Sequence, residues 1–162
     1  MFSVAVVTVS DRGARGERVD ESGRTIAEIV TDQGWEVRDT RIVSDNIEVI
    51  IETLVELCDR KINLVLTTGG TGFALRDNTP EATLAVVERQ VPGLAEAMRA
   101  ETSKKTPRAM LSRAVAGIRK RSLIVNLPGS PKAVRECLDA ILPVLPHGLE
   151  ILTGRAHECA RE

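Results

Sequence analysis

The sequence predicts an α/β fold, a mostly parallel sheet with helices on both faces and one antiparallel hairpin. Short runs rich in β-branched residues alternate along the chain with amphipathic helical segments, the pattern of strand–helix–strand units. The first and third runs, residues 4–9 and 62–66, are apolar on both faces, as expected of strands covered by helices on each side. The chain has 162 residues, which suits a single domain spanning residues 1–162.

The first half of the chain contains three predicted strands, at residues 4–9, 35–43 and 62–66. A polar, glycine-containing loop follows the first strand, and a helix then runs from about Ser22 to Gly34, which stops it in the usual position. Ser44 and Asp45 are suitable N-caps for a second helix. Its buried stripe is predicted to contain Ile47, Ile50, Ile51, Leu54, Leu57 and Cys58.

The second half begins with Thr79-Pro80-Glu81, typical of a helix start: a cap, proline in the first helical position and an acid near the positive end. A short helix is expected at residues 94–100, after a break at Val91-Pro92-Gly93. Residues 114–118 and 123–127 are predicted to form the hairpin, with residues 119–121 at its solvated tip. Ser130-Pro131 starts the last clear helix, which Pro143 and Pro146 end or kink. Only the tail after Gly154 is polar enough to fray.

Composition excludes several classes of protein. Aromatic residues make up 2% of the chain and its formal net charge is −1, so neither base stacking nor a basic surface favours nucleic-acid binding. Cys58, Cys137 and Cys159 form no CxxC pair, which favours a reduced, cytoplasmic protein. Cys58 and Cys137 lie on apolar stripes and are expected to pack in the core. His147 and His157 have no metal-ligand spacing and are assigned surface or packing roles.

Membrane and export segments are not expected. No run of 18 apolar residues occurs, so no transmembrane helix is predicted. The N-terminus lacks a basic region followed by a long apolar run, so no signal peptide is predicted either.

Polar and glycine-rich loops leave the carboxyl ends of the predicted strands, where ligands bind in parallel sheets. These loops contain Ser10-Asp11, Ser44-Asp45, the run from Thr68 to Gly72, Arg76-Asp77 and Pro128-Gly129-Ser130. We expect three acidic residues, several hydroxyls and two glycine-containing turns to meet on one rim.

Each of these features also has a simpler structural interpretation. Gly69-Gly70-Thr71-Gly72 could bring N–H groups close to phosphate, or form a tight strand-to-helix turn; it matches neither GxGxxG nor a phosphate-binding loop ending in Lys-Ser/Thr. Asp77 and Asp45 could bind Mg²⁺ or act as local caps. The turn at residues 128–131 could aim backbone donors at an anion or simply cap a helix. Phe73 could line a flat-ring pocket or plug the core under the loop.

Three segments together resemble a known family. Ser10-Asp11-Arg12, the GGTG run with the following RDNTPEAT sequence (residues 76–83), and Leu127-Pro128-Gly129-Ser130-Pro131-Lys132 are similar to the molybdopterin-binding family. That family includes bacterial molybdopterin adenylyltransferases and the G domain of gephyrin. Residues 111–117, LSRAVAG, are also typical of it. The resemblance covers almost the whole chain, in order and with similar spacing.

The resemblance implies a three-layer α/β/α domain, usually assembled as a homotrimer. It implies that ATP and molybdopterin are the substrates and that adenylylated molybdopterin and pyrophosphate are the products. Asp45 and Asp77 match the two functionally important aspartates of active members. We assign Asp77 to Mg²⁺, and Asp45 either as a second Mg²⁺ ligand or as a residue that positions substrate. The implied substrate-binding set is Ser10, Asp11, Thr68, Gly69, Gly70, Thr71, Gly72, Thr79, Glu81, Ser112, Pro128, Gly129, Ser130 and Lys132.

Two alternatives to this function stay open. A non-catalytic molybdopterin carrier or scaffold would bind the pterin without nucleotide turnover, although the intact Asp45 and Asp77 argue against it. A generic phosphate-binding α/β enzyme would rest on fold logic alone. Phe73 stands where the family's bacterial enzymes tend to have proline. Apart from ATP and molybdopterin, the expected partner is the pathway's metal-insertion enzyme, in a transient contact.

Overall fold

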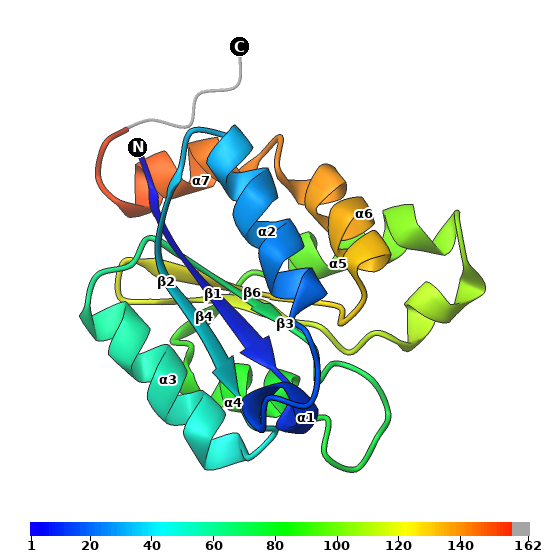
Figure 1. The fold of residues 1–162 in the computed structure, drawn as a ribbon. Helices are drawn as coiled ribbons and strands as arrows, with labels where there is room; N and C mark the ends of the chain where they lie inside the picture. The colour runs from blue at the N-terminus through cyan, green and yellow to red at the C-terminus, as the bar shows by residue number, and fades with distance from the viewer. Residues whose placement is uncertain (157–162) are drawn as a thin grey trace.

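Six strands form one sheet in the order β2-β1-β3-β6-β5-β4 (Figure 1). The computed structural model describes residues 1–156. The strands are β1 (Ser3–Val9), β2 (Glu36–Val43), β3 (Leu64–Thr68), β4 (Arg89–Gln90), β5 (Ala116–Arg119) and β6 (Ser122–Leu127). β1, β2, β3 and β6 are parallel, whereas β5 runs antiparallel between β6 and β4. The predicted mostly parallel sheet and its hairpin are therefore confirmed.

Helices cover both faces of the sheet (Figure 1). One layer contains α2 (Glu21–Asp32), α5 (Pro92–Ser103), α6 (Pro131–Ile141) and α7 (Leu145–Leu152). The other contains α3 (Ile47–Asp59) and α4 (Thr79–Val86). The short α1 (Asp11–Ala14) follows β1, and the 3-10 helix η1 (Pro107–Leu111) precedes β5. The three-layer arrangement implied by the resemblance is thus confirmed.

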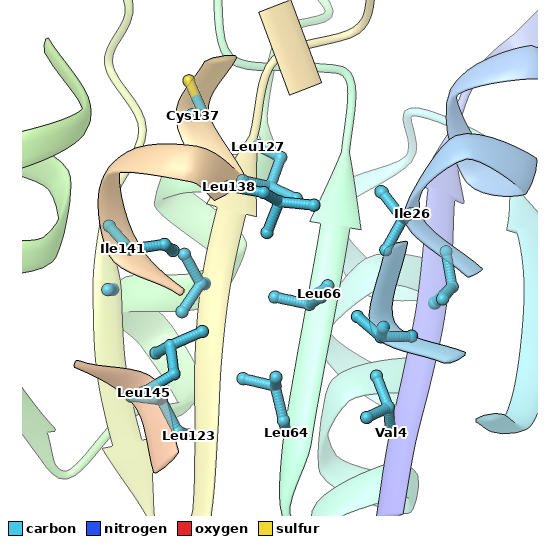
Figure 2. Close-up of a cluster of buried hydrophobic side chains, with 14 of the residues drawn as sticks. Val4, Ile26, Leu64, Leu66, Leu123, Leu127, Cys137, Leu138, Ile141 and Leu145 are labelled. Atoms are coloured by element: carbon cyan, nitrogen blue, oxygen red, sulfur yellow. The ribbon is translucent and has the colours of Figure 1, made fainter. Parts of the chain in front are cut away.

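The core is aliphatic and lies in two clusters, one on each face of the sheet. Because successive strand residues point to opposite faces, Val4 and Val6 of β1 pack on one side and Ala5 and Val7 on the other. Figure 2 shows the first cluster, where Leu64, Leu66, Leu123 and Leu127 of the strands meet helical residues that include Ile26, Leu138 and Ile141. Cys58 and Cys137 are buried in these clusters, as predicted.

Several local predictions were wrong, mostly at helix ends. Asn46 caps α3, because its side chain accepts a 3.1 Å bond from the Val49 N–H; Ser44 and Asp45 do not. Thr79 is the first residue of α4 rather than its cap. The helix expected at residues 94–100 extends over Pro92–Ser103, because proline is tolerated in a first turn.

The predicted end of the last clear helix is confirmed, because α6 ends at Ile141, just before Pro143. The sequence pattern did not predict the further helix α7, which begins at Leu145 with Pro146 in its first turn. There the missing N–H of proline has no intrahelical partner to lose. The predicted tail after Gly154 lies partly outside the described residues, and His157 and Cys159 lie wholly outside them. Within the described chain, no helix is both long and apolar enough to cross a membrane.

A buried amide ties the sheet to the surrounding segments. Asn126 of β6 is fully buried, and its Nδ2 donates to the hydroxyls of Thr67 (3.0 Å) and Thr83 (2.9 Å). Its Oδ1 accepts a 3.2 Å bond from the N–H of Val115. One side chain therefore joins β6 to β3, α4 and the segment before β5.

Replacing this amide should destabilise the fold strongly. We expect Asn126→Ala to lower the free energy of unfolding by about 3 kcal/mol, since it removes two buried bonds and one partly buried bond and leaves the Val115 N–H unpaired. Urea denaturation followed by circular dichroism measures the loss. Thr83→Ser, which keeps the hydroxyl, is the control and should cost about 1 kcal/mol or less. A loss below about 1 kcal/mol for Asn126→Ala would contradict the assigned role.

Candidate active site

The carboxyl ends of the parallel strands open into a polar cleft of about 420 Å³. Its walls come from the loops after β1, β2, β3 and β6, as expected for a sheet of this topology. Seven residues of the predicted site line it: Ser10, Asp45, Thr68, Gly69, Gly70, Asp77 and Gly129. The segment from Arg18 to Ser22 forms a further wall, which the sequence pattern predicts only as a polar loop and a helix start.

Asp11 and Asp45 hold the first two loops together through reciprocal bonds. The N–H of Asp11 donates to Asp45 Oδ2 (2.8 Å), and the N–H of Asp45 donates to Asp11 Oδ1 (3.0 Å). Arg76 also donates to the Asp11 carboxylate, from Nε at 2.6 Å and from Nη2 at 2.9 Å. Asn78 Nδ2 donates to the carbonyl of Asp45 (3.2 Å). The loop that carries Asp77 is therefore fastened to the loops that carry Asp11 and Asp45.

Asp77 and Asp45 place two carboxylates on one cleft. Both are half-buried, and Asp77 Oδ2 accepts a 2.9 Å bond from the N–H of Ala74. No group of three or more His, Cys, Asp or Glu side chains that could enclose a metal occurs within residues 1–156. Mg²⁺ is commonly held by one or two carboxylates together with substrate phosphates and water. The donors present thus fit Mg²⁺ delivered with a nucleotide.

The pKa values of Asp11 and Asp45 are shifted in opposite directions. The bonds from Arg76, aided by the Asp45 N–H, lower the pKa of Asp11 to about 2. Burial raises the pKa of Asp45 above its ordinary value; the Asp11 N–H opposes this shift, and the negative charges of Asp11 and Asp77 add to it. The stabilisation from Asp11 is therefore complete above its unfolded pKa of about 4 and is lost as pH falls toward 2.

Carbon-detected NMR of the side-chain carboxyls measures the pKa values of Asp11 and Asp45. Arg76→Gln is the matched variant, in which the Asp11 pKa should return toward its ordinary range while Asp45 keeps a raised pKa. An ordinary Asp11 pKa in the parent protein would contradict the ion pair with Arg76.

The glycine turn after β3 brings backbone close to the neighbouring strands. Gly69 has φ +91° and Gly70 has φ +68°, conformations that side chains rarely adopt. The N–H of Gly69 donates to Leu127 O (3.2 Å), and the Thr68 hydroxyl donates to Pro128 O (2.6 Å). These bonds hold the turn after β3 against the turn after β6, so that both border the cleft.

A second, more apolar pocket of about 270 Å³ borders the same turns after β3 and β6. Its lining includes Thr71, Gly72, Ser112 and Pro128 from the predicted site, with apolar side chains such as Met98. The same two turns thus separate a polar cleft from an apolar pocket, since Gly70 lines the first and Thr71 the second.

Several predicted residues lie elsewhere. Thr79 donates from its hydroxyl to Gly69 O (2.9 Å), and Glu81 pairs with Arg113, so both act within the protein. Ser130 caps α6 by accepting from the Ala133 N–H (3.2 Å). Lys132 is exposed and lines neither pocket.

Phe73 does not plug the core. Its side chain is 70% exposed, which overturns the plug interpretation, and it lines neither pocket. Sequence reasoning also missed Arg113 and Asn126, whose bonds reach across the fold from positions with no periodic signal.

With this fold and cleft, the chain belongs to the molybdopterin-binding domain family, whose description is "probable molybdopterin binding domain" and whose model matches residues 5–147. The resemblance seen in the motifs is confirmed. Among its relatives, the molybdopterin adenylyltransferase of Helicobacter pylori (strain J99) is 44% identical over 154 residues, covering 93% of this chain and 88% of the relative. That of Haemophilus influenzae (strain Rd) is 45% identical over 175 residues, with coverages of 95% and 86%. The structure of the molybdopterin biosynthesis enzyme MoaB from Thermus thermophilus is 52% identical, covers 95% of this chain and 98% of its own, and superposes with a TM-score of 0.90.

Proposed function

We propose that the protein is a molybdopterin adenylyltransferase of molybdenum-cofactor synthesis, which transfers the adenylyl group of ATP to the terminal phosphate of molybdopterin. One observation carries the proposal: Asp45 and Asp77 share a polar cleft that the glycine-containing turns after β3 and β6 also line. Relatives of this name, 44% and 45% identical over most of the chain, support the same reaction.

In this mechanism, the terminal phosphate of molybdopterin attacks the α-phosphorus of ATP. A new P–O bond forms, the bond to the β-phosphate breaks, and pyrophosphate leaves. A phosphate monoester has a second pKa of about 6 and is largely dianionic at neutral pH, so the attack needs no general base. The reaction instead requires alignment and charge neutralisation of two polyanions.

The residues of the cleft supply that alignment. Gly70 and Gly129 line the cleft, and glycine lets phosphate oxygens approach the backbone closely because it carries no side chain, so their backbone N–H groups are the proposed phosphate donors. Asp77 and Asp45 would hold Mg²⁺, which neutralises the phosphate charge when bound. The adjoining apolar pocket, next to Ser112, has the walls and volume for a flat heterocyclic ring of the substrates.

The experiment that tests the reaction mixes purified protein with molybdopterin, ATP and Mg²⁺ and detects adenylylated molybdopterin by mass spectrometry. Omission of ATP or Mg²⁺ should abolish the product, and pyrophosphate should appear in equal amount. Pterin binding without any product would replace this proposal with a carrier or scaffold. Neither product nor pterin binding would restrict the family assignment to the fold.

We also propose that the chain assembles as a homotrimer in the cytoplasm and contacts the metal-insertion enzyme transiently. The support is the resemblance together with exposed apolar side chains near the site, among them Phe73, Leu75 and Met110. Light scattering on the purified protein measures the trimer directly; a monomeric mass at working concentration would contradict it.

A further inference from the structure

Besides Arg76 and Asn78, Arg113 also fastens the loop carrying Asp77, and it does so from the side of the segment before β5. Its Nε donates to the carbonyl of Gly72 (2.8 Å), and its Nη2 donates to the carbonyl of Asp77 (2.8 Å). Its third nitrogen, Nη1, pairs with the carboxylate of Glu81 in the first turn of α4. One planar guanidinium therefore bridges both ends of the loop and the helix that follows it.

The loop between Gly72 and Asp77 needs such a support. It contains no regular helix or strand, and its side chains are largely exposed, Leu75 completely so. Within the loop, Ala74 and Asp77 exchange two bonds: the Asp77 N–H donates to Ala74 O, and the Ala74 N–H donates to Asp77 Oδ2, each at 2.9 Å. These bonds shape the turn but do not attach it to the core.

Arg113 is itself fixed from the other side. Arg99 of α5 donates from Nη1 to the carbonyls of Ser112 (3.3 Å) and Ala114 (2.8 Å), on either side of it. The N–H of Arg113 donates to Thr71 O (2.9 Å), and the buried Asn126 holds the next segment through Val115. The core thus determines where the guanidinium lies. The guanidinium in turn holds the backbone of Asp77 itself, while Arg76 and Asn78 hold its two neighbours to the loops carrying Asp11 and Asp45.

We propose that Arg113 is a positioning residue for Asp77, setting the affinity of the cleft for its divalent cation and the alignment of the bound nucleotide. This rests on the proposed function. The carboxylate of Asp77 must stay within about 0.5 Å of its productive position, and misplacement by about 1 Å costs on the order of 100-fold in rate. Residues that orient a metal ligand without touching the metal typically contribute about 10- to 100-fold in metal affinity or activity.

Arg113→Lys is the decisive variant. Lysine keeps the charge for Glu81, but its single nitrogen cannot bridge the three acceptors that the planar guanidinium bridges. We expect the dissociation constant of Mn²⁺, measured by electron paramagnetic resonance with a non-hydrolysable ATP analogue bound, to rise about tenfold. In the adenylylation assay, kcat should fall about 10- to 100-fold and recover in part at high Mg²⁺, while the KM for molybdopterin changes less.

Arg119→Lys is the matched control. Arg119 also donates to a backbone carbonyl, that of Val86 (3.0 Å), and lines neither pocket. Arg119→Lys should lower the melting temperature, because that bond is lost, and leave Mn²⁺ binding at the parent value. If Arg113→Lys does not fold, Arg113→Gln replaces it, because glutamine keeps an N–H donor on an uncharged side chain.

The outcomes separate the inference from the proposed function. Parent-like Mn²⁺ binding and kcat in a folded Arg113 variant would overturn the inference and leave the transferase reaction intact. Equal losses of Mn²⁺ affinity and kcat in the Arg113 and Arg119 variants would show that Arg113 has a merely structural role. That result would also overturn the inference. If the parent binds Mn²⁺ but forms no product, the reaction is wrong, and the Mn²⁺ comparison still decides the role of Arg113. A parent protein that binds no Mn²⁺ would overturn both.

Discussion

Asp77→Asn should remove nearly all Mg²⁺-dependent adenylylation while leaving the fold intact. The asparagine oxygen can still accept the bond from the Ala74 N–H, which is 2.9 Å in the parent protein, so the loop should keep its shape. What is lost is one negative charge at the proposed metal position. We expect kcat to fall about a thousandfold, which corresponds to about 4 kcal/mol of transition-state stabilisation.

Parallel kinetics on a matched variant test this expectation. Asp59→Asn makes the same chemical change at an exposed carboxylate that pairs with Lys120 at the hairpin tip, away from the cleft. Its kcat should equal that of the parent protein. Melting curves should place both variants close to the parent. Normal turnover by a folded Asp77→Asn variant would remove Asp77 from the metal site.

The layered fold follows closely from the sequence because burial imposes a period on it. Strand β1 is apolar at nearly every position since helices cover both of its faces, and the stripe of α6, with Val134 and Leu138, is equally regular. Proline and cap signals were less decisive. Asn46 and Asp45 are both good caps by residue type, and only the tertiary contact between Asp45 and Asp11 decides between them.

Only part of the candidate site could be predicted from the sequence. Parallel strands must end on one rim, so the meeting of Ser10, Asp45 and Gly69 can be predicted from topology alone. Long-range hydrogen bonds between side chains and backbone cannot be predicted in this way. Arg113 lies 36 residues from Asp77 and 41 from Gly72, and an arginine bonded to carbonyls creates no local pattern in the sequence. Asn126 is hidden for the same reason, within a strand that otherwise looks like ordinary core.

Gly69→Ala should destabilise the fold about as strongly as Asn126→Ala. At φ +91°, an added Cβ would lie 2.5 Å from the carbonyl oxygen of Val9, a backbone atom of the neighbouring strand. The unfavourable conformation costs about 1–2 kcal/mol, and the overlap adds about 1–3 kcal/mol. We expect a total of about 3 kcal/mol and a fall in melting temperature of about 10 °C.

Gly34→Ala separates the two contributions. Gly34 also has positive φ, +77°, but an added Cβ there would meet nothing within 4 Å. Gly34→Ala should therefore lower the free energy of unfolding only by the cost of the positive φ, about 1 kcal/mol. The excess loss in Gly69→Ala measures the cost of the close approach of Gly69 to β1. We expect this approach to set the width of the cleft that Ser10 and Gly70 line. Relief of that overlap by strand separation would also widen the cleft, so turnover below the melting temperature should fall in Gly69→Ala and not in Gly34→Ala. Equal losses of stability in the two variants would mean that the strands adjust freely and that the cleft width is not set at Gly69.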